Sequence, residues 1–188
     1  MSALSPLTVA FPLAVAVLII DFVFRDRSGP DRDRSQDRGS SLLVWVSIFA
    51  TLTLVPSLSS AGPLRFEEYA IGWLGLVIMS VGIATRAWAR VTLGRYFSVK
   101  LEMREKQPLV EEGPYARVRH PGYLGYLLMW AGLAVSSMSG LAVIVVILLF
   151  SIVYSYRIRN EEAMLVATLG PAYEQYMRRT RRLIPFIY

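Results

Sequence analysis

Long apolar segments, separated by charged or Pro/Gly-rich connections, decide what this chain of 188 residues can fold into. The first of them approaches the length of about 20 apolar residues that a helix needs to cross a bilayer. Composition agrees, because 54% hydrophobic and 18% charged residues are too apolar for an ordinary soluble domain. We therefore expect an all-α integral membrane protein with about five transmembrane helices, at residues 3–24, 42–58, 69–89, 123–135 and 141–156.

The last two apolar segments are short for membrane spans, and Ser136 to Gly140 connects them. A tight helical hairpin that continues into the cytosolic layer fits them better than two isolated helices. After the hairpin, the Gly170-Pro171 dipeptide interrupts the helix, and residues 173–182 form an amphipathic segment. Arginines and aromatic residues near this end predict a short helix in the headgroup layer.

The Lys and Arg residues gather on one side of the predicted spans. Residues 25–40, residues 86–120 and the tail from 157 hold 5, 8 and 6 of the 20 Lys and Arg residues, and only Arg65 falls on the other side. By the positive-inside rule the N-terminus lies outside, and the charged segments and the C-terminus are cytoplasmic. Topology alone therefore accounts for the net charge of +6, and we expect no nucleic-acid partner.

The chain contains no cysteine and a single histidine. Cysteine-based nucleophiles, disulfides and cysteine-rich metal sites are thereby excluded, and one histidine argues against a histidine-rich metal centre. We expect no metal site.

A charged segment between the third and fourth apolar runs, residues 100–123, holds that histidine, His120. Two dipeptides within it, Gln107-Pro108 and Gly113-Pro114, break any continuing helix. Pro121 is favoured at the first position of a helix and is expected to start the fourth span. His120 then lies at a helix N-terminus, where a ligand carboxylate is stabilised. A hydrogen-bonded structural histidine is the alternative interpretation.

A second polar cluster, residues 157–162, follows the fifth apolar run. If the helix continues, Arg157 and Glu161 lie at positions i and i+4 on one face, with Tyr154 near them. Glu162 turns away from that face by about 100°. The alternative is an ordinary basic end of a membrane span with a surface ion pair. We expect the two clusters to face each other and to form one pocket.

Four motifs occur in order within residues 95–188: Arg119-His-Pro-Gly-Tyr-Leu-Gly125, Glu161-Glu162, Tyr173-Glu-Gln-Tyr176 and Arg182-Leu-Ile-Pro185. Together they resemble the isoprenylcysteine carboxyl methyltransferase family, which is related to the phospholipid N-methyltransferases. Residues 1–90 resemble this family only as generic membrane spans. The chain accordingly divides into N-terminal membrane helices with a charged loop at 25–40, residues 1–92, and a catalytic region with the hairpin and a cytoplasmic C-terminal helix, residues 93–188.

The resemblance implies a membrane enzyme that transfers a methyl group from S-adenosylmethionine to the carboxylate of a prenylated C-terminal cysteine. The cofactor pocket would be cytoplasmic and formed by the C-terminal half. The prenylated cysteine, or another lipid-linked acceptor, would enter from the surrounding membrane lipid. Arg157 would be the catalytic residue and would hold the substrate carboxylate. The cofactor would be bound by Lys100, Gln107, Pro108, Leu109, Val110, Tyr115, His120, Pro121, Gly122, Tyr123 and Glu161.

The residue types agree with this chemistry. Methyl transfer from a sulfonium is an in-line displacement, in which the enzyme mainly aligns the reacting atoms and excludes water. A carboxylate is already ionised near neutral pH, so the reaction requires no general base. Arg157 can orient such a carboxylate through parallel hydrogen bonds. Small residues of the third span favour close helix packing, and together with Met129-Trp130 they are also candidates for a lateral gate for the lipid. They are Gly72, Gly75, Ser80, Gly82 and Ala84.

Three other functions remain open at this stage. A phospholipid amine methyltransferase would need Glu161 or Glu162 as a base or relay, because its nucleophile must lose a proton. A membrane sterol reductase would bind a nicotinamide cofactor instead. A small membrane scaffold would need neither Arg157 nor Glu161.

Overall fold

The structure is a computed structural model that describes residues 5–23, 39–61, 64–96 and 109–183. The charged loop expected at 25–40 lies outside these ranges, apart from its last two residues.

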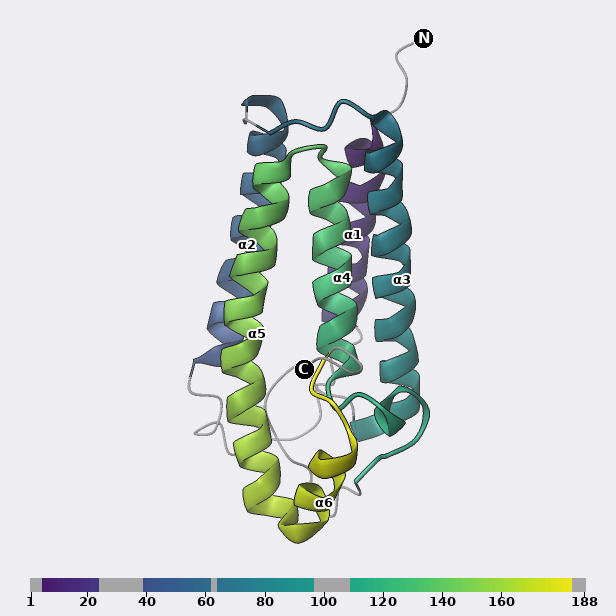
Figure 1. Cartoon of the computed structure of the whole chain (residues 1–188), viewed down its shortest axis with the longest axis vertical. Helices are drawn as coiled ribbons and strands as arrows, with labels where there is room; N and C mark the ends of the chain where they lie inside the picture. Colours follow the sequence, from purple (N-terminus) through teal and green to yellow (C-terminus); the bar gives the residue numbers. More distant parts are fainter. Residues whose placement is uncertain (1–4, 24–38, 62–63, 97–108, 184–188) are drawn as a thin grey trace.

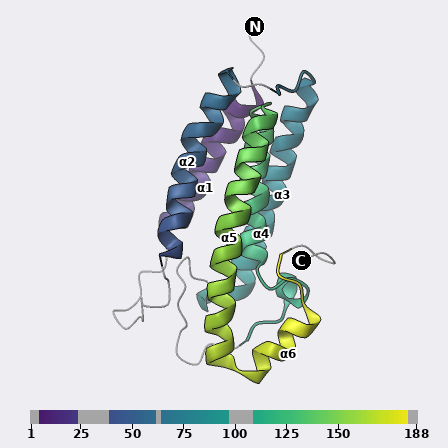
Figure 2. The ribbon, with the colours of Figure 1, turned by 60° about the vertical axis from the view of Figure 1, so that its left-hand side comes forward.

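Five long helices lie side by side in an elongated bundle, and a short helix, α6, lies at one end of it (Figure 1 and Figure 2). Within the described ranges the chain forms no β-strand beyond isolated bridges. Two short 3-10 turns, η2 (Gly94–Tyr96) and η3 (Gly113–Ala116), precede the fourth long helix. The helices are α1 (Pro6–Val23), α2 (Ser40–Ala61), α3 (Tyr69–Leu93), α4 (Pro121–Ser136), α5 (Gly140–Leu169) and α6 (Pro171–Arg179).

The predicted all-helical membrane fold is confirmed. Four described helices, α1, α2, α3 and α5, are long and apolar enough to cross a membrane. Helix α4 has 16 residues, fewer than the about 20 of a full span, but it runs inside the bundle between α3 and α5 (Figure 1). It begins at Pro121, as the sequence predicts. Helix α5 has 30 residues and extends well past the expected end at 156, so that residues 157–162 continue the same helix.

Helices α3 and α4 touch through their glycines. A Cβ atom at Gly82 would lie 2.5 Å from the backbone nitrogen of Met129, and one at Gly132 would lie 2.5 Å from the carbonyl oxygen of Gly75. Such distances leave no room for a side chain, and close backbone approach of this kind is typical of helix pairs in lipid. The predicted packing role of the third-span glycines is therefore confirmed for Gly75 and Gly82.

The structure contradicts the predicted lateral gate at Gly75, Gly82 and Met129-Trp130. Met129 and Trp130 are fully buried, and the Trp130 ring stacks on Phe150 with centroids 5.4 Å apart. Because Gly75 and Gly82 face α4 and both large side chains fill the core, none of these four residues lines a passage to the lipid.

The segment after α6 pairs with the segment before α4. The backbone N–H of Arg119 donates to the carbonyl of Arg181 at 2.7 Å, and that of His120 donates to the carbonyl of Arg182 at 3.1 Å. Helix α5 ends at Gly170, whose positive φ of 56° lets the chain reverse into α6. The backbone hydrogen bonds bring Arg181 and Arg182 against the Arg-His-Pro motif.

Replacing Gly82 by leucine should destabilise the bundle, because the new side chain meets the α4 backbone. We expect a loss of more than about 2 kcal/mol in unfolding free energy, as is usual for overpacking. Ala84→Leu, at an exposed position of the same helix, should change it by no more than about 0.5 kcal/mol. Thermal unfolding in detergent compares the two, and equal melting temperatures would show that the α3–α4 contact is loose.

Candidate functional site

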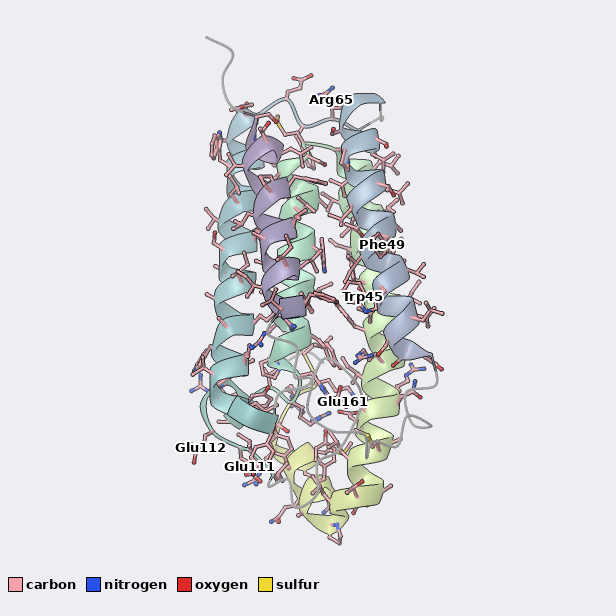
Figure 3. All side chains as sticks on the ribbon, turned by 180° about the vertical axis from the view of Figure 1, so that it is seen from behind. Trp45, Phe49, Arg65, Glu111, Glu112 and Glu161 are labelled. Carbon is pink, nitrogen blue, oxygen red and sulfur yellow. The ribbon has the colours of Figure 1, made fainter. Side chains whose placement is uncertain are left out.

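One cavity collects most of the side chains that the sequence singles out. It lies at the end of the bundle opposite Arg65; Figure 3 shows Arg65 at one end and Glu161 near the other. Helices α1 to α6 and the segment before α4 all contribute to its wall. Of the predicted site residues, the wall contains Leu109, Val110, Tyr115, His120, Gly122, Tyr123, Arg157 and Glu161.

The other predicted residues are placed differently. Pro121 is buried and starts α4 beside the cavity, without being part of the wall. Lys100, Gln107 and Pro108 lie outside the described residues.

The hydroxyl group of Tyr123 joins Arg157 to Glu161. It donates a hydrogen bond to Glu161 Oε2 at 2.6 Å and accepts one from Arg157 Nε at 2.8 Å. The Tyr123 ring also stacks on His120 and on Tyr154, with centroids 5.7 and 5.3 Å apart. The two polar clusters therefore meet, as the sequence predicts, and Tyr123 is the residue through which they meet.

Glu162 faces away from Tyr123 and binds two arginines. Its carboxylate accepts hydrogen bonds from Arg119 Nε at 2.7 Å and from Arg182 Nε at 2.8 Å, while its side chain is only 4% exposed. Arg119 also donates to the backbone carbonyl of Thr180 at 2.5 Å. Glu162 thus ties α5 to the Arg-His-Pro motif and to the chain after α6, whereas the neighbouring Glu161 faces the cavity.

His120 is buried between the two glutamates. Its Nδ1 atom lies 3.8 Å from Glu161 Oε2, and its Nε2 atom lies 3.5 Å from Glu162 Oε1. Nε2 makes no hydrogen bond to any described residue. Nε2 therefore faces the Glu162 carboxylate, whereas Nδ1 faces Glu161, which belongs to the cavity wall.

Asp21 organises a third polar cluster deeper in the bundle. Its carboxylate accepts hydrogen bonds from Arg86 Nε at 2.8 Å, Arg90 Nη1 at 2.8 Å and Tyr126 Oη at 2.5 Å. The Arg86 guanidinium lies over the Tyr126 ring, 3.5 Å from its centroid, and Arg86 Nη1 is 3.4 Å from the carbonyl oxygen of Gly122. Asp21, Arg86 and Tyr126 all line the cavity. The sequence analysis missed this cluster, although one acid inside an apolar run is a recognised signal of a functional or paired residue.

Buried tyrosines close the side of the cavity next to α6. Burial raises the pKa of Tyr115, Tyr173 and Tyr176 well above the usual value of a phenol. These groups therefore stay protonated at neutral pH and act as hydrogen-bond donors; Tyr176 donates to the carbonyl of Tyr115 at 2.7 Å. Tyr173 and Tyr176 belong to a motif quoted above, but the sequence analysis gave them no role in the site.

Bundle and cavity together define a class: a multi-pass integral membrane protein of α-helices, with a cavity that is polar on one side and apolar on the other. Comparison with known families then identifies the chain. Residues 73–167 match the model of the isoprenylcysteine carboxyl methyltransferase (ICMT) family, and the chain belongs to this family. The predicted resemblance is confirmed; the matched segment begins earlier than expected, within α3, and ends before α6.

Individual relatives agree. A probable protein-S-isoprenylcysteine O-methyltransferase of Oryza sativa subsp. indica is 32% identical over 123 residues, which cover 64% of each chain. The protein-S-isoprenylcysteine O-methyltransferase of Schizosaccharomyces pombe is 36% identical over 137 residues, covering 66% of this chain and 56% of the yeast protein. The chain therefore spans between 56% and 64% of the length of these relatives.

The fold is also found in a solved structure. The eukaryotic intramembrane Ras methyltransferase ICMT, solved without a monobody, superposes with a TM-score of 0.66 at 24% identity. The match covers all of this chain and 70% of the other. At this identity the likeness concerns the fold.

The two adjacent glutamates should respond differently to the same substitution. Glu162→Gln breaks buried ion pairs with Arg119 and Arg182, and we expect a loss of about 3 kcal/mol or more in unfolding free energy. Glu161→Gln, whose side chain is 25% exposed, should lose only about 1 kcal/mol, the usual value of one hydrogen bond. Thermal unfolding of the ligand-free variants measures both, and a larger effect at Glu161 would contradict the assignment.

Proposed function

We propose that the protein is a methyltransferase that uses S-adenosylmethionine to methylate the C-terminal carboxylate of a prenylated cysteine. One observation carries the proposal: a single cavity combines the Arg-His-Pro motif, the Arg157–Tyr123–Glu161 cluster and apolar side chains of two membrane helices. The names of the related proteins from rice and fission yeast support the same reaction.

The donor would bind at the end of the cavity next to α6. Tyr115 provides an aromatic face and Leu109 and Val110 provide apolar contacts there, as an adenine ring requires. The carboxylate of Glu161 suits the cationic part of the donor, and the His120 ring lies beside it in the cavity wall. Gly122, Tyr123, Lys100, Gln107, Pro108 and Pro121 complete the proposed donor site.

When bound, S-adenosylmethionine supplies an electrophilic methyl group on a sulfonium. The residues of this chain then have to bind the donor and the acceptor, orient them toward each other and exclude water from the cavity. Tyr123 holds Arg157 and Glu161 through one hydroxyl group, which fixes the donor end relative to the acceptor end. Because an ionised carboxylate needs no base, the catalytic contribution that we propose for Arg157 is to orient the acceptor oxygen toward the methyl group.

The acceptor would bind at the opposite end. Leu18 and Phe22 of α1, and Val44, Trp45 and Ile48 of α2, line the cavity on the membrane side of Arg157. A prenyl chain is apolar and would reach these residues from the lipid, while the donor would come from the aqueous side. Helices α1 and α2 therefore replace the third and fourth spans as the proposed route of the lipid.

The charges of the wall favour an acid over an amine as acceptor. Arg86 is paired with Asp21 and Arg119 with Glu162, so the preference rests on Arg157, which lines the cavity beside the apolar side chains of α2. An ammonium acceptor would be repelled by the guanidinium of Arg157, and it would also have to lose a proton before attack. The phospholipid amine methyltransferase is thereby the second candidate, and neither the family nor the relatives point to a nicotinamide-dependent sterol reductase.

We also propose that the cavity and the C-terminus face the cytoplasm. The support is the asymmetry of Lys and Arg, 19 of 20 of which lie on the cavity side of the predicted topology. The proposed division of the chain is retained, with residues 93–188 as the catalytic region. Residues 1–92 contribute more than membrane anchoring, because Asp21, Ser41 and Arg86 belong to the cavity wall.

Labelled methyl donor and purified protein in detergent test the reaction. We expect transfer to a farnesylated cysteine with a free carboxylate, and none to its methyl ester or to phosphatidylethanolamine. S-adenosylhomocysteine, and not NADPH, should raise the melting temperature, because a ligand that binds the folded state stabilises it. Transfer to phosphatidylethanolamine alone would replace the proposal by the amine methyltransferase.

Arg157→Lys keeps the positive charge but loses the planar guanidinium that orients a carboxylate. We expect kcat/KM for the farnesylated cysteine to fall by about 100-fold, corresponding to about 3 kcal/mol, with little change in the Kd of S-adenosylhomocysteine. Calorimetry and the methylation assay separate the two quantities. The matched control is Arg159→Lys, at an exposed position two residues further along α5, in which kcat/KM and the Kd of S-adenosylhomocysteine should both stay unchanged. A loss of donor affinity in Arg157→Lys would instead assign Arg157 to the donor site.

A further inference from the structure

We propose that Ser40 and Ser41, the first two residues of α2, position the guanidinium of Arg157 for the acceptor carboxylate. This inference rests on the proposed function and adds two positioning residues to the site. Neither serine belongs to the predicted site, and both lie outside the segment that matches the family, residues 73–167.

The contacts are direct. Arg157 Nη1 donates to Ser40 Oγ at 3.0 Å and to Ser41 Oγ at 3.2 Å. Ser40 is fully buried and Arg157 is 2% exposed, so both partners are held in the interior. A buried guanidinium has to satisfy its N–H donors within the protein, and these two hydroxyls do so on the side opposite Tyr123, which accepts from Nε.

The described side-chain partners of Arg157 are hydroxyl groups, whereas those of two other arginines of the wall include carboxylates. Arg86 donates to the carboxylate of Asp21, and Arg119 donates to that of Glu162. Arg157 donates to the hydroxyl groups of Tyr123, Ser40 and Ser41. Hydroxyl oxygens that accept from a guanidinium fix its direction, and a fixed direction is what the orientation of an acceptor carboxylate requires.

The fold determines where the serines lie. Gly39 has a positive φ of 74° and its carbonyl accepts from the N–H of Leu43, so that α2 begins at Ser40. Helix α2 packs along α5, and this packing places its first turn beside Arg157. On the same helix, one to two turns further on, Val44, Trp45 and Ile48 line the apolar part of the cavity. Helix α2 would therefore contact both the head and the chain of a lipid-linked acid.

The test compares the Ser40→Ala/Ser41→Ala double variant with the unchanged protein in detergent. The probes are S-farnesylcysteine with a free carboxylate and its methyl ester, and their Kd values are measured in the absence of donor. We expect the double variant to bind the acid about 10-fold more weakly, as the loss of hydrogen bonds to a charged group predicts. The Kd values of the ester and of S-adenosylhomocysteine should stay unchanged.

Two further variants separate positioning from folding. Ser41→Thr keeps a hydroxyl at the half-buried position and should retain more of the affinity for the acid than Ser41→Ala. Ser47→Ala removes another buried serine hydroxyl of α2, which donates to the carbonyl of Val44, and should leave the preference for acid over ester intact. A purely structural role of the two N-terminal serines would weaken acid, ester and nucleoside binding alike.

Each failure has a distinct meaning. An unchanged Kd of the acid in the double variant, or an equal loss for acid and ester, overturns the positioning role alone. Binding of the acid by the unchanged protein without methyl transfer rejects the proposed reaction but leaves the positioning role to be judged by the Kd values. Absence of binding to both farnesylated probes in the unchanged protein overturns both proposals.

Discussion

The structure of the site depends on the buried carboxylate of Glu162. By accepting from Arg119 and Arg182 at 2.7 and 2.8 Å, it holds three separate pieces of chain at one point: α5, the segment that leads into α4, and the segment that follows α6. The backbone segments that carry these arginines, at residues 119–120 and 181–182, are hydrogen-bonded to each other. A buried ion pair of this kind is costly to break from one side. The end of the bundle is therefore held together by the ion pairs of Glu162 with Arg119 and Arg182, and not by apolar packing alone.

Neighbouring glutamates on α5 serve different purposes because a helix turns by about 100° per residue. Glu162 faces Arg119 and Arg182, whereas Glu161 faces the cavity and accepts a hydrogen bond from Tyr123 at 2.6 Å. Arg157, one turn before Glu161, reaches the same hydroxyl from the other side. Tyr123 thus holds Arg157 and Glu161 at a fixed separation, and with them the proposed acceptor and donor sites. The close α3–α4 contact supports this arrangement, because it fixes α4, on which Tyr123 stands.

Local signals explain what could be predicted from the sequence. Hydropathy predicted the helical bundle, Pro121 predicted the start of α4, and helical periodicity predicted that Arg157 and Glu161 share a face and that Glu162 leaves it. Contacts between distant residues carried no such signal: Asp21 and Arg86 are 65 positions apart, and Ser40 and Arg157 are 117 apart. Small residues are equally ambiguous, because the glycines of α3 could have faced a lipid passage or another helix until α4 was seen against them.

The origin of the cavity walls bears on how function can be transferred between members of the family. The segment that matches the family supplies Tyr115, His120, Tyr123, Arg157 and Glu161, while the apolar end of the cavity comes from α1 and α2, before residue 73. If the proposed function holds, two members can share the residues that we propose for methyl transfer and still differ in the size and shape of the hydrophobic tail that they accommodate. The segment that matches the family excludes α1 and α2. Similarity within that segment is therefore a poor guide to acceptor preference, and the first two helices should be compared instead.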